Sequence, residues 1–153
     1  MMIMQAIPLF SDRPTVLVAE DEAFIREMLV DALEEAGFEV VAVAAAEDAL
    51  GFAVMDFAFD ALVTDIELDG PLDGWDLAAT TREMRPDLPV VYASASAAAD
   101  RATRGVAGAV FVPKPYNPVK LAETLAGLVA ARRAAQASTA GERANRPPLR
   151  LIA

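Results

Sequence analysis

Short apolar runs alternate with longer stretches of helical periodicity along most of this chain. The runs are rich in valine and have the length of buried parallel strands; they cover residues 15–19, 39–44, 61–64, 89–93 and 109–112. Helical stretches follow them at residues 22–36, 47–56, 74–84, 97–104 and 117–133. Because strand and helix alternate and such crossovers are right-handed, the pattern predicts an α/β fold with a doubly wound, five-stranded parallel sheet.

The helical stretches differ in how clearly their apolar residues repeat. In residues 22–36 the pattern predicts one apolar face made of Phe24, Met28, Leu29 and Leu33. Residues 97–104 carry mostly small side chains with little apolar periodicity. We therefore expect residues 97–104 to form the shortest or most mobile element of the fold.

Charged residues stand at the ends of three of the predicted strands. Glu20 and Asp21 follow the first apolar run, Asp65 follows the third, and Lys114 follows the fifth. In an open parallel sheet the carboxyl ends of the strands line a common crevice, so these residues are expected to converge there. Carboxylates with one lysine suit a divalent metal ion and a phosphoryl group.

Composition narrows the chemistry that this crevice can perform. A length of 153 residues is enough for one domain with a substantial core. The chain has no cysteine, which excludes disulfides and thiolate chemistry and favours a reducing compartment, by default the cytoplasm. It also has no histidine, which excludes a Ser-His-Asp triad, imidazole metal ligands and phosphohistidine. Any phosphoryl acceptor must therefore be a residue of another type.

The charge is distributed unevenly along the chain. Residues 15–131 hold 21 acidic and 7 basic residues, a net charge of −14, which makes DNA an unsuitable partner. Residues 132–153 hold five arginines and one glutamate, a net charge of +4. We therefore expect a folded domain at 14–131 and a flexible basic tail at 132–153, disordered or a frayed helical extension. Residues 1–13 are expected to form a loose leader, too short to insert into a membrane.

Four motifs, met in the same order along the chain, resemble the receiver domain of two-component response regulators. This CheY-like family has a flavodoxin-like (βα)5 fold and takes a phosphoryl group on an aspartate. The matching segments are Val-Leu-Val-Ala-Glu20-Asp21-Glu22, Val-Thr-Asp65-Ile-Glu67-Leu, Val-Val-Tyr-Ala-Ser94-Ala and Phe111-Val-Pro-Lys114-Pro115-Tyr. The resemblance covers residues 15 to 129.

The resemblance implies a role for each site residue. Asp65 would be the phosphoacceptor, and Mg²⁺ would be held by Glu20, Asp21, Asp65 and the backbone carbonyl of Glu67. Lys114 would place its positive charge on the acyl phosphate. Such charge stabilisation suits phosphoryl transfer, in which the protein supplies alignment and charge but little covalent chemistry beyond the nucleophile.

The resemblance also implies a switch. Ser94 would contact a phosphoryl oxygen, and Phe111 on the fifth strand would turn inward, remodelling a surface for output. The Lys114–Pro115 bond would be cis. Trp75, at the start of the third helix, suits a packing role as well as a partner contact.

The sequence departs from the family pattern near the acceptor. Glu20 stands where many members have aspartate, which keeps the charge. The loop at 68–74 holds Asp69 in place of the usual proline and is one residue longer, which leaves its conformation open. Glu67 and Ser96 occupy positions that tune the lifetime of the phosphoryl group in this family, in a direction the sequence does not decide.

The function expected from these features is that of a stand-alone receiver and not of an enzyme. A histidine kinase or histidine phosphotransfer protein would donate the phosphoryl group, and an unknown downstream protein would bind the product. The alternatives are a receiver-like binding module that works without phosphorylation and a Mg²⁺-dependent phosphohydrolase. The aspartate-based hydrolase families place their nucleophile at the end of the first strand with a second aspartate two residues on. This chain has Glu20-Asp21-Glu22-Ala23 there, which argues against a hydrolase. We expect a monomer or a weak, phosphorylation-dependent dimer.

Overall fold

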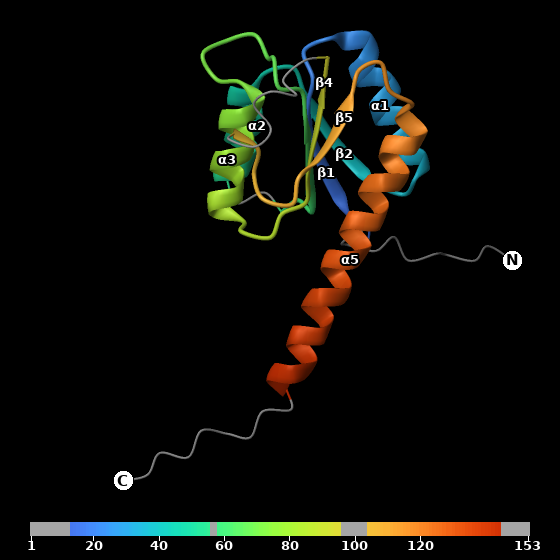
Figure 1. The fold of residues 1–153 in the computed structure, drawn as a ribbon, viewed down its shortest axis with the longest axis vertical. Helices are drawn as coiled ribbons and strands as arrows, with labels where there is room; N and C mark the ends of the chain where they lie inside the picture. The colour runs from blue at the N-terminus through green and yellow to red at the C-terminus, as the bar shows by residue number, and fades with distance from the viewer. Residues whose placement is uncertain (1–12, 56–57, 96–103, 145–153) are drawn as a thin grey trace, which may run out of the picture.

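The fold is built on one five-stranded parallel sheet. The computed structural model describes residues 13–55, 58–95 and 104–144. The strands are β1 (Thr15–Ala19), β2 (Glu39–Val43), β3 (Ala61–Thr64), β4 (Val90–Ser94) and β5 (Val110–Pro113). They lie in the order β2-β1-β3-β4-β5, and each neighbouring pair is parallel (Figure 1). This is the strand order of the flavodoxin-like receiver fold, so the predicted fold class is confirmed.

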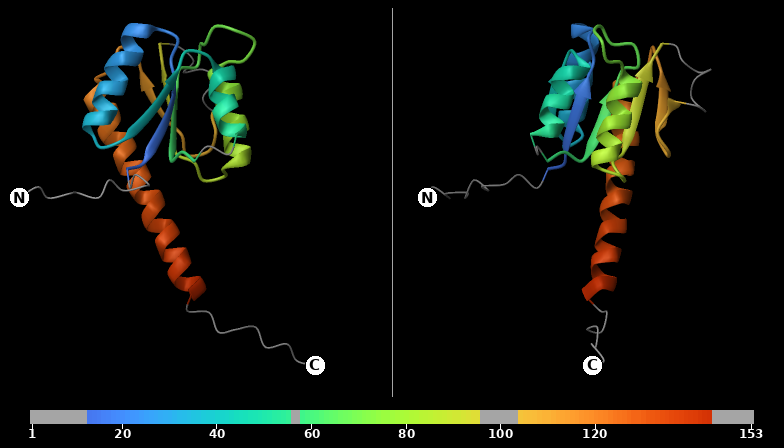
Figure 2. Two further views of the ribbon diagram at one scale, coloured as in Figure 1. Left: turned by 180° about the vertical axis from the view of Figure 1, so that it is seen from behind. Right: turned by 90° about the vertical axis from the view of Figure 1, so that its left-hand side faces the viewer.

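Helices cover both faces of the sheet. The described helices are α1 (Ala23–Glu35), α2 (Ala46–Val54), α3 (Gly74–Met84) and α5 (Pro118–Ala144). Helices α1 and α5 pack on one face, and α2 and α3 on the other (Figure 2). The predicted bounds of β1, β3 and α3 are those observed. The helix expected at 97–104 and the site position Ser96 lie outside the described residues, apart from Arg104.

The alternation of side chains along the buried strands divides the core in two. In β1, Val16 and Val18 face the α1–α5 layer, whereas Leu17 and Ala19 face the α2–α3 layer. All four side chains are fully buried. Strands buried on both faces have no polar side, which explains why they appear in the sequence as continuous apolar runs.

The single apolar face predicted for α1 is wrong. Leu29 and Leu33 are buried against the sheet, but Phe24 is 71% exposed and Met28 42% exposed. Each helical residue turns by about 100°, so positions 24 and 33 lie about 180° apart around the axis. The four residues therefore form two stripes, of which only one reaches the core.

Helix α5 is longer than the sequence pattern predicts. The helix predicted at 117–133 continues to Ala144, so residues 134–144 form the helical extension that the sequence left open as an alternative to disorder. The expected domain limit at residue 131 falls inside this helix. Arg132 Nη2 pairs with Asp87 Oδ1 at 3.1 Å, and Arg133 Nη2 lies 3.9 Å from Asp60 Oδ1. The hydrogen bond from Arg132 lowers the pKa of the Asp87 carboxyl. Among the described helices, none has the length and apolarity required to cross a membrane.

Candidate phosphoacceptor and metal site

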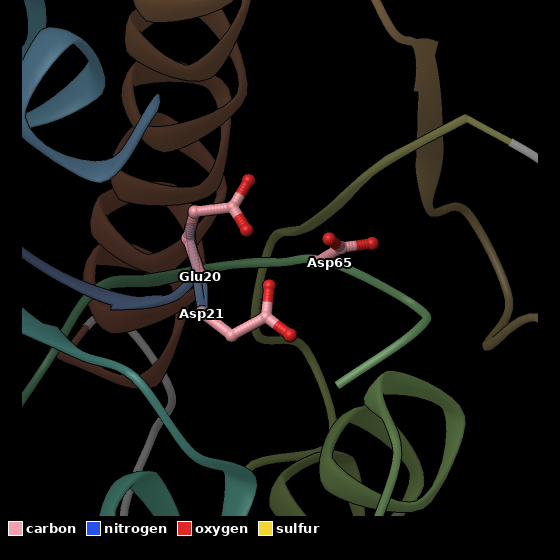
Figure 3. Close-up of side chains that lie close together, drawn as sticks. All are labelled: Glu20, Asp21 and Asp65. Carbon is pink, nitrogen blue, oxygen red and sulfur yellow. The ribbon is translucent and has the colours of Figure 1, made fainter. Parts of the chain in front are cut away.

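Two adjacent strand ends bring three carboxylates together. The backbone of Asp65 donates from its N–H to Ala19 O at 2.9 Å, and Glu20 N–H donates to Val43 O at 3.0 Å. The first bond places the residues just beyond β1 and β3 side by side, and the second ties Glu20 to the end of β2. One oxygen from each of Glu20, Asp21 and Asp65 lies within 4.8 Å of the others. Figure 3 shows these three side chains. The convergence predicted from the strand order is therefore observed.

Lys114 reaches this cluster from the end of β5. Its Nζ lies 2.6 Å from Glu20 Oε1 and 2.8 Å from Asp65 Oδ2. The Lys114 N–H donates to Ser94 O at 3.0 Å, which holds the lysine beside the end of β4. The Lys114 side chain is only 14% exposed, and those of Glu20 and Asp65 are 4% and 8% exposed. Lys114, a largely buried cation, thus neutralises part of the buried charge of Glu20 and Asp65. The Lys114–Pro115 peptide bond is cis, as expected.

Burial and charge shift the pKa values of this group. Burial alone would lower the pKa of Lys114, but its hydrogen bonds to Asp65 and Glu20 outweigh that effect and raise it. Burial raises the pKa of Glu20, and the nearby charge of Asp65 adds to the rise while Lys114 opposes it. Lys114 therefore stays charged, and it is the cation that permits neighbouring carboxylates to be buried.

Asp65 is oriented by the backbone around it. The N–H of Glu67 donates to Asp65 Oδ1 at 3.2 Å, and the Thr64 hydroxyl donates to Asp65 O at 2.8 Å. The Glu67 side chain itself is exposed. The sequence pattern did not single out Thr64. A polar residue inside a fully buried apolar strand nevertheless indicates a side chain that needs a hydrogen-bond partner. Hydrogen bonds thus hold both the carboxylate and the main chain of the proposed acceptor.

Ser94 is the last residue of β4, and Phe111 lies within β5. Ser94 is buried at the end of β4. The Phe111 ring stacks on Tyr92 with 4.9 Å between centroids and lies 5.9 Å from the Trp75 ring. Trp75 is 3% exposed, which assigns it a packing role in this cluster. The Tyr92 hydroxyl accepts a bond from Val106 N–H at 3.2 Å, so the aromatic cluster is linked to the segment before β5.

A match to a known family identifies this fold. A family model described as the response regulator receiver domain matches residues 16–126. The chain belongs to this receiver family. Its members are generally non-catalytic signalling modules that histidine kinases phosphorylate.

Individual relatives agree with that assignment. Response regulator protein FleR of Pseudomonas aeruginosa is 35% identical over 113 residues, which make up 72% of this chain and 24% of FleR. Sensory/regulatory protein RpfC of Xanthomonas campestris pv. campestris is 34% identical over 124 residues, 77% of this chain and 17% of RpfC. The chain thus spans a quarter or less of these two relatives. A receiver protein of Sinorhizobium medicae with a crystal structure is 36% identical, with a TM-score of 0.76 over 79% of this chain and 98% of the other.

The acidic cluster fits the magnesium site of a receiver. The three side chains offer only oxygen ligands, which Mg²⁺ prefers, and one or two carboxylates with water and phosphoryl oxygens complete its usual shell. The acidic cluster Glu20, Asp21 and Asp65 is typical of receiver Mg²⁺ sites. The Glu67 carbonyl, expected as a further ligand, follows Asp65 by two residues on the same loop.

Tyr116 is a neighbour of the receiver site that the sequence did not indicate. Its hydroxyl oxygen is buried, and no hydrogen-bond partner for it exists within the described part of the chain. The residue lines a pocket of about 460 Å³ together with Lys114, Ala95, Ile25 and Met28. Burial, followed by the charge of Glu20, raises the pKa of Tyr116 to about 12.

The two tyrosines are expected to make the receiver less stable at alkaline pH. Burial also raises the pKa of Tyr92 above its ordinary value of 10.0. Above pH 10 the unfolded chain therefore releases tyrosine protons that the folded chain retains, so the free energy of unfolding falls as pH rises toward 12. Urea midpoints at pH 9 and pH 11 test this expectation. The fall should be smaller in Tyr116→Phe, and an equal fall in both proteins would contradict it.

Proposed function

We propose that this receiver accepts one phosphoryl group on Asp65 and signals through protein contacts that depend on it. The observation that carries the proposal is the contact of Lys114 Nζ with Asp65 Oδ2 inside the buried carboxylate cluster. A carboxylate held beside a fixed cation suits attack on a phosphorylated donor, because the cation also stabilises charge on the incoming group.

The proposed reaction is a simple displacement at phosphorus. A carboxylate oxygen of Asp65 forms a bond to phosphorus, the bond from phosphorus to the donor imidazole nitrogen breaks, and that nitrogen takes up a proton from solvent. Lys114 stays in place as the counter-charge throughout. The Ser94 hydroxyl donates a hydrogen bond to a phosphoryl oxygen once the group has arrived. Bound Mg²⁺ would neutralise negative charge on the transferring group.

The donor is proposed to be a histidine kinase or a histidine phosphotransfer protein. The outer stripe of α1 supports a protein donor, since Phe24 and Met28 are exposed apolar residues on the helix that follows Glu20 and Asp21. Met28 also lines the pocket beside Lys114, with Pro115 and Pro118. An apolar surface next to the acceptor fits a protein better than a small polar donor.

The remaining parts of the proposal follow from the family. The receiver is placed in the cytoplasm, where its family is typically found, and its output partner is a protein that binds the face around Phe111. A monomer or a weak dimer is proposed for the unphosphorylated chain. Phosphorylation would act by biasing a two-state element whose other end is this docking surface.

Intact mass after incubation with Mg²⁺ and a small acyl phosphate tests the proposed function. The wild-type chain is expected to gain one labile phosphoryl group, and Asp65→Asn is expected to gain none. Asp69→Asn is the matched control, since it makes the same change at an exposed residue of the same loop and should leave the adduct intact. An unmodified wild-type chain, with Mg²⁺ binding verified, would favour the binding module that works without phosphorylation.

A further inference from the structure

The loop that follows the acceptor is contacted by a carboxylate from another helix. Glu47 lies in the first turn of α2, and its Oε1 accepts a hydrogen bond from the N–H of Leu72 at 3.1 Å. The same carboxylate lies against the backbone of Gly70: a Cβ built on Gly70 would stand 3.2 Å from Oε1 and 3.4 Å from Oε2. Glu47 therefore hydrogen-bonds to Leu72 and lies close to Gly70, in the middle of the loop.

Gly70 is suited to this contact in two ways. Its φ of +113° lies in the region that residues with a side chain rarely adopt. It also leaves room for the Glu47 carboxylate, which a side chain at this position would crowd. The turn at Gly70 thus presents main chain to Glu47 and directs the Leu72 N–H toward it.

The two ends of the same loop belong to the phosphoacceptor site. At one end, Glu67 N–H donates to Asp65 Oδ1. At the other end, Gly74 N–H donates to Ile66 O at 2.8 Å, where α3 begins. A movement of the middle of the loop would be transmitted to both of these bonds.

We propose that Glu47 is a positioning residue for phosphoryl transfer, which holds the β3–α3 loop so that Asp65 and the Glu67 backbone keep their working orientation. The inference rests on the proposed function. The bond pairs the Leu72 N–H in one loop conformation, and an unpaired donor costs free energy, so this contact favours that conformation. Small displacements of reacting groups cost large factors in rate, which makes loop position important for the reaction.

Three variants of the full chain separate positioning from a general effect of charge. Glu47→Ala removes the acceptor of the Leu72 bond, whereas Glu47→Gln removes the charge but keeps an oxygen in that place. Asp48→Ala is the matched control, because Asp48 is an exposed carboxylate in the same helical turn. Thermal unfolding of each variant checks that the fold is intact.

The first readout needs no phosphoryl donor and no metal. Amide hydrogen exchange at Leu72 and Glu67 is expected to speed up roughly tenfold or more in Glu47→Ala, since the loop opens locally. Glu47→Gln and Asp48→Ala should stay within about twofold of the wild type. Unchanged exchange at Leu72 in Glu47→Ala, or equal loss of protection in Glu47→Gln, would overturn the proposal.

The second readout is the rate at which the phosphoryl adduct forms with a small acyl phosphate. Glu47→Ala is expected to slow it by about tenfold to a hundredfold, and Glu47→Gln to restore most of the rate. An adduct that forms equally fast on the wild type and Glu47→Ala would overturn the role of Glu47 and leave the proposed function standing. No adduct on the wild type would overturn both.

Discussion

Replacing Gly74 with alanine is expected to lower the free energy of unfolding by about 3 kcal/mol, a large cost for overpacking a buried site. The added Cβ would overlap the backbone carbonyl oxygen of Asp65 and lie 2.8 Å from Ile66 Cα. Both are main-chain atoms of the acceptor loop, so neither can move away as a flexible side chain could. The loop must shift, and we expect the phosphoryl adduct on Asp65 to be lost as well.

Urea unfolding of Gly74→Ala and intact mass with an acyl phosphate measure these two effects. Gly127→Ala is the matched control, because Gly127 is an exposed residue of α5 with open space around its Cβ position. Alanine there should stabilise the protein by roughly 0.5 to 1 kcal/mol, since it favours helix over coil. A stable, normally phosphorylated Gly74→Ala variant would show that the acceptor loop tolerates displacement.

Replacing Lys114 with alanine is expected to cost about 3 kcal/mol of stability at neutral pH without Mg²⁺, as is usual when one partner of a buried ion pair is removed. The change leaves the buried carboxylates of Glu20 and Asp65 without the cation that contacts both. Their mutual repulsion then opposes folding. Phosphorylation should also slow, because the fixed counter-charge beside Asp65 is lost.

A double-mutant cycle tests whether the cost comes from the carboxylates. Asp65→Asn introduced into the Lys114→Ala variant removes one of the repelling charges, so it should recover part of the lost stability. Lys120→Ala is the control, because Lys120 is an exposed residue of α5 and should change the free energy of unfolding by less than about 0.5 kcal/mol. Equal costs for the two lysines would contradict a neutralising role for Lys114.

Local sequence was sufficient to locate a strand or helix wherever the pattern within that element alone identifies it. The strands could be located because a buried parallel strand needs apolar residues on both faces, as in residues 61–64. The end of α5 could not, because residues beyond 133 lack an apolar face. That segment nevertheless contains alanines, which form helix without one. Arg132 and Arg133 then attach its start to Asp87 and Asp60, residues distant in sequence.

The sequence likewise predicted only part of the candidate site. Glu20, Asp21, Asp65 and Lys114 could be grouped from the sequence because parallel strands all deliver their carboxyl ends to one edge. The aromatic contacts of Phe111 with Tyr92 and Trp75 depend on side-chain directions that periodicity does not contain. The sequence therefore indicated which residues meet but not which ring packs on which.

The sequence by itself determined the order of strands and helices and the charged residues at the strand ends, since both depend on local patterning and on the geometry common to all parallel sheets. Only the tertiary structure decided that Glu47 contacts the acceptor loop, that the Tyr116 hydroxyl is buried beside the site, and that Phe24 faces outward. These features depend on distances between separate elements and on how each helix is rotated about its axis. Such quantities are set by the packing of the whole core and not by any one segment.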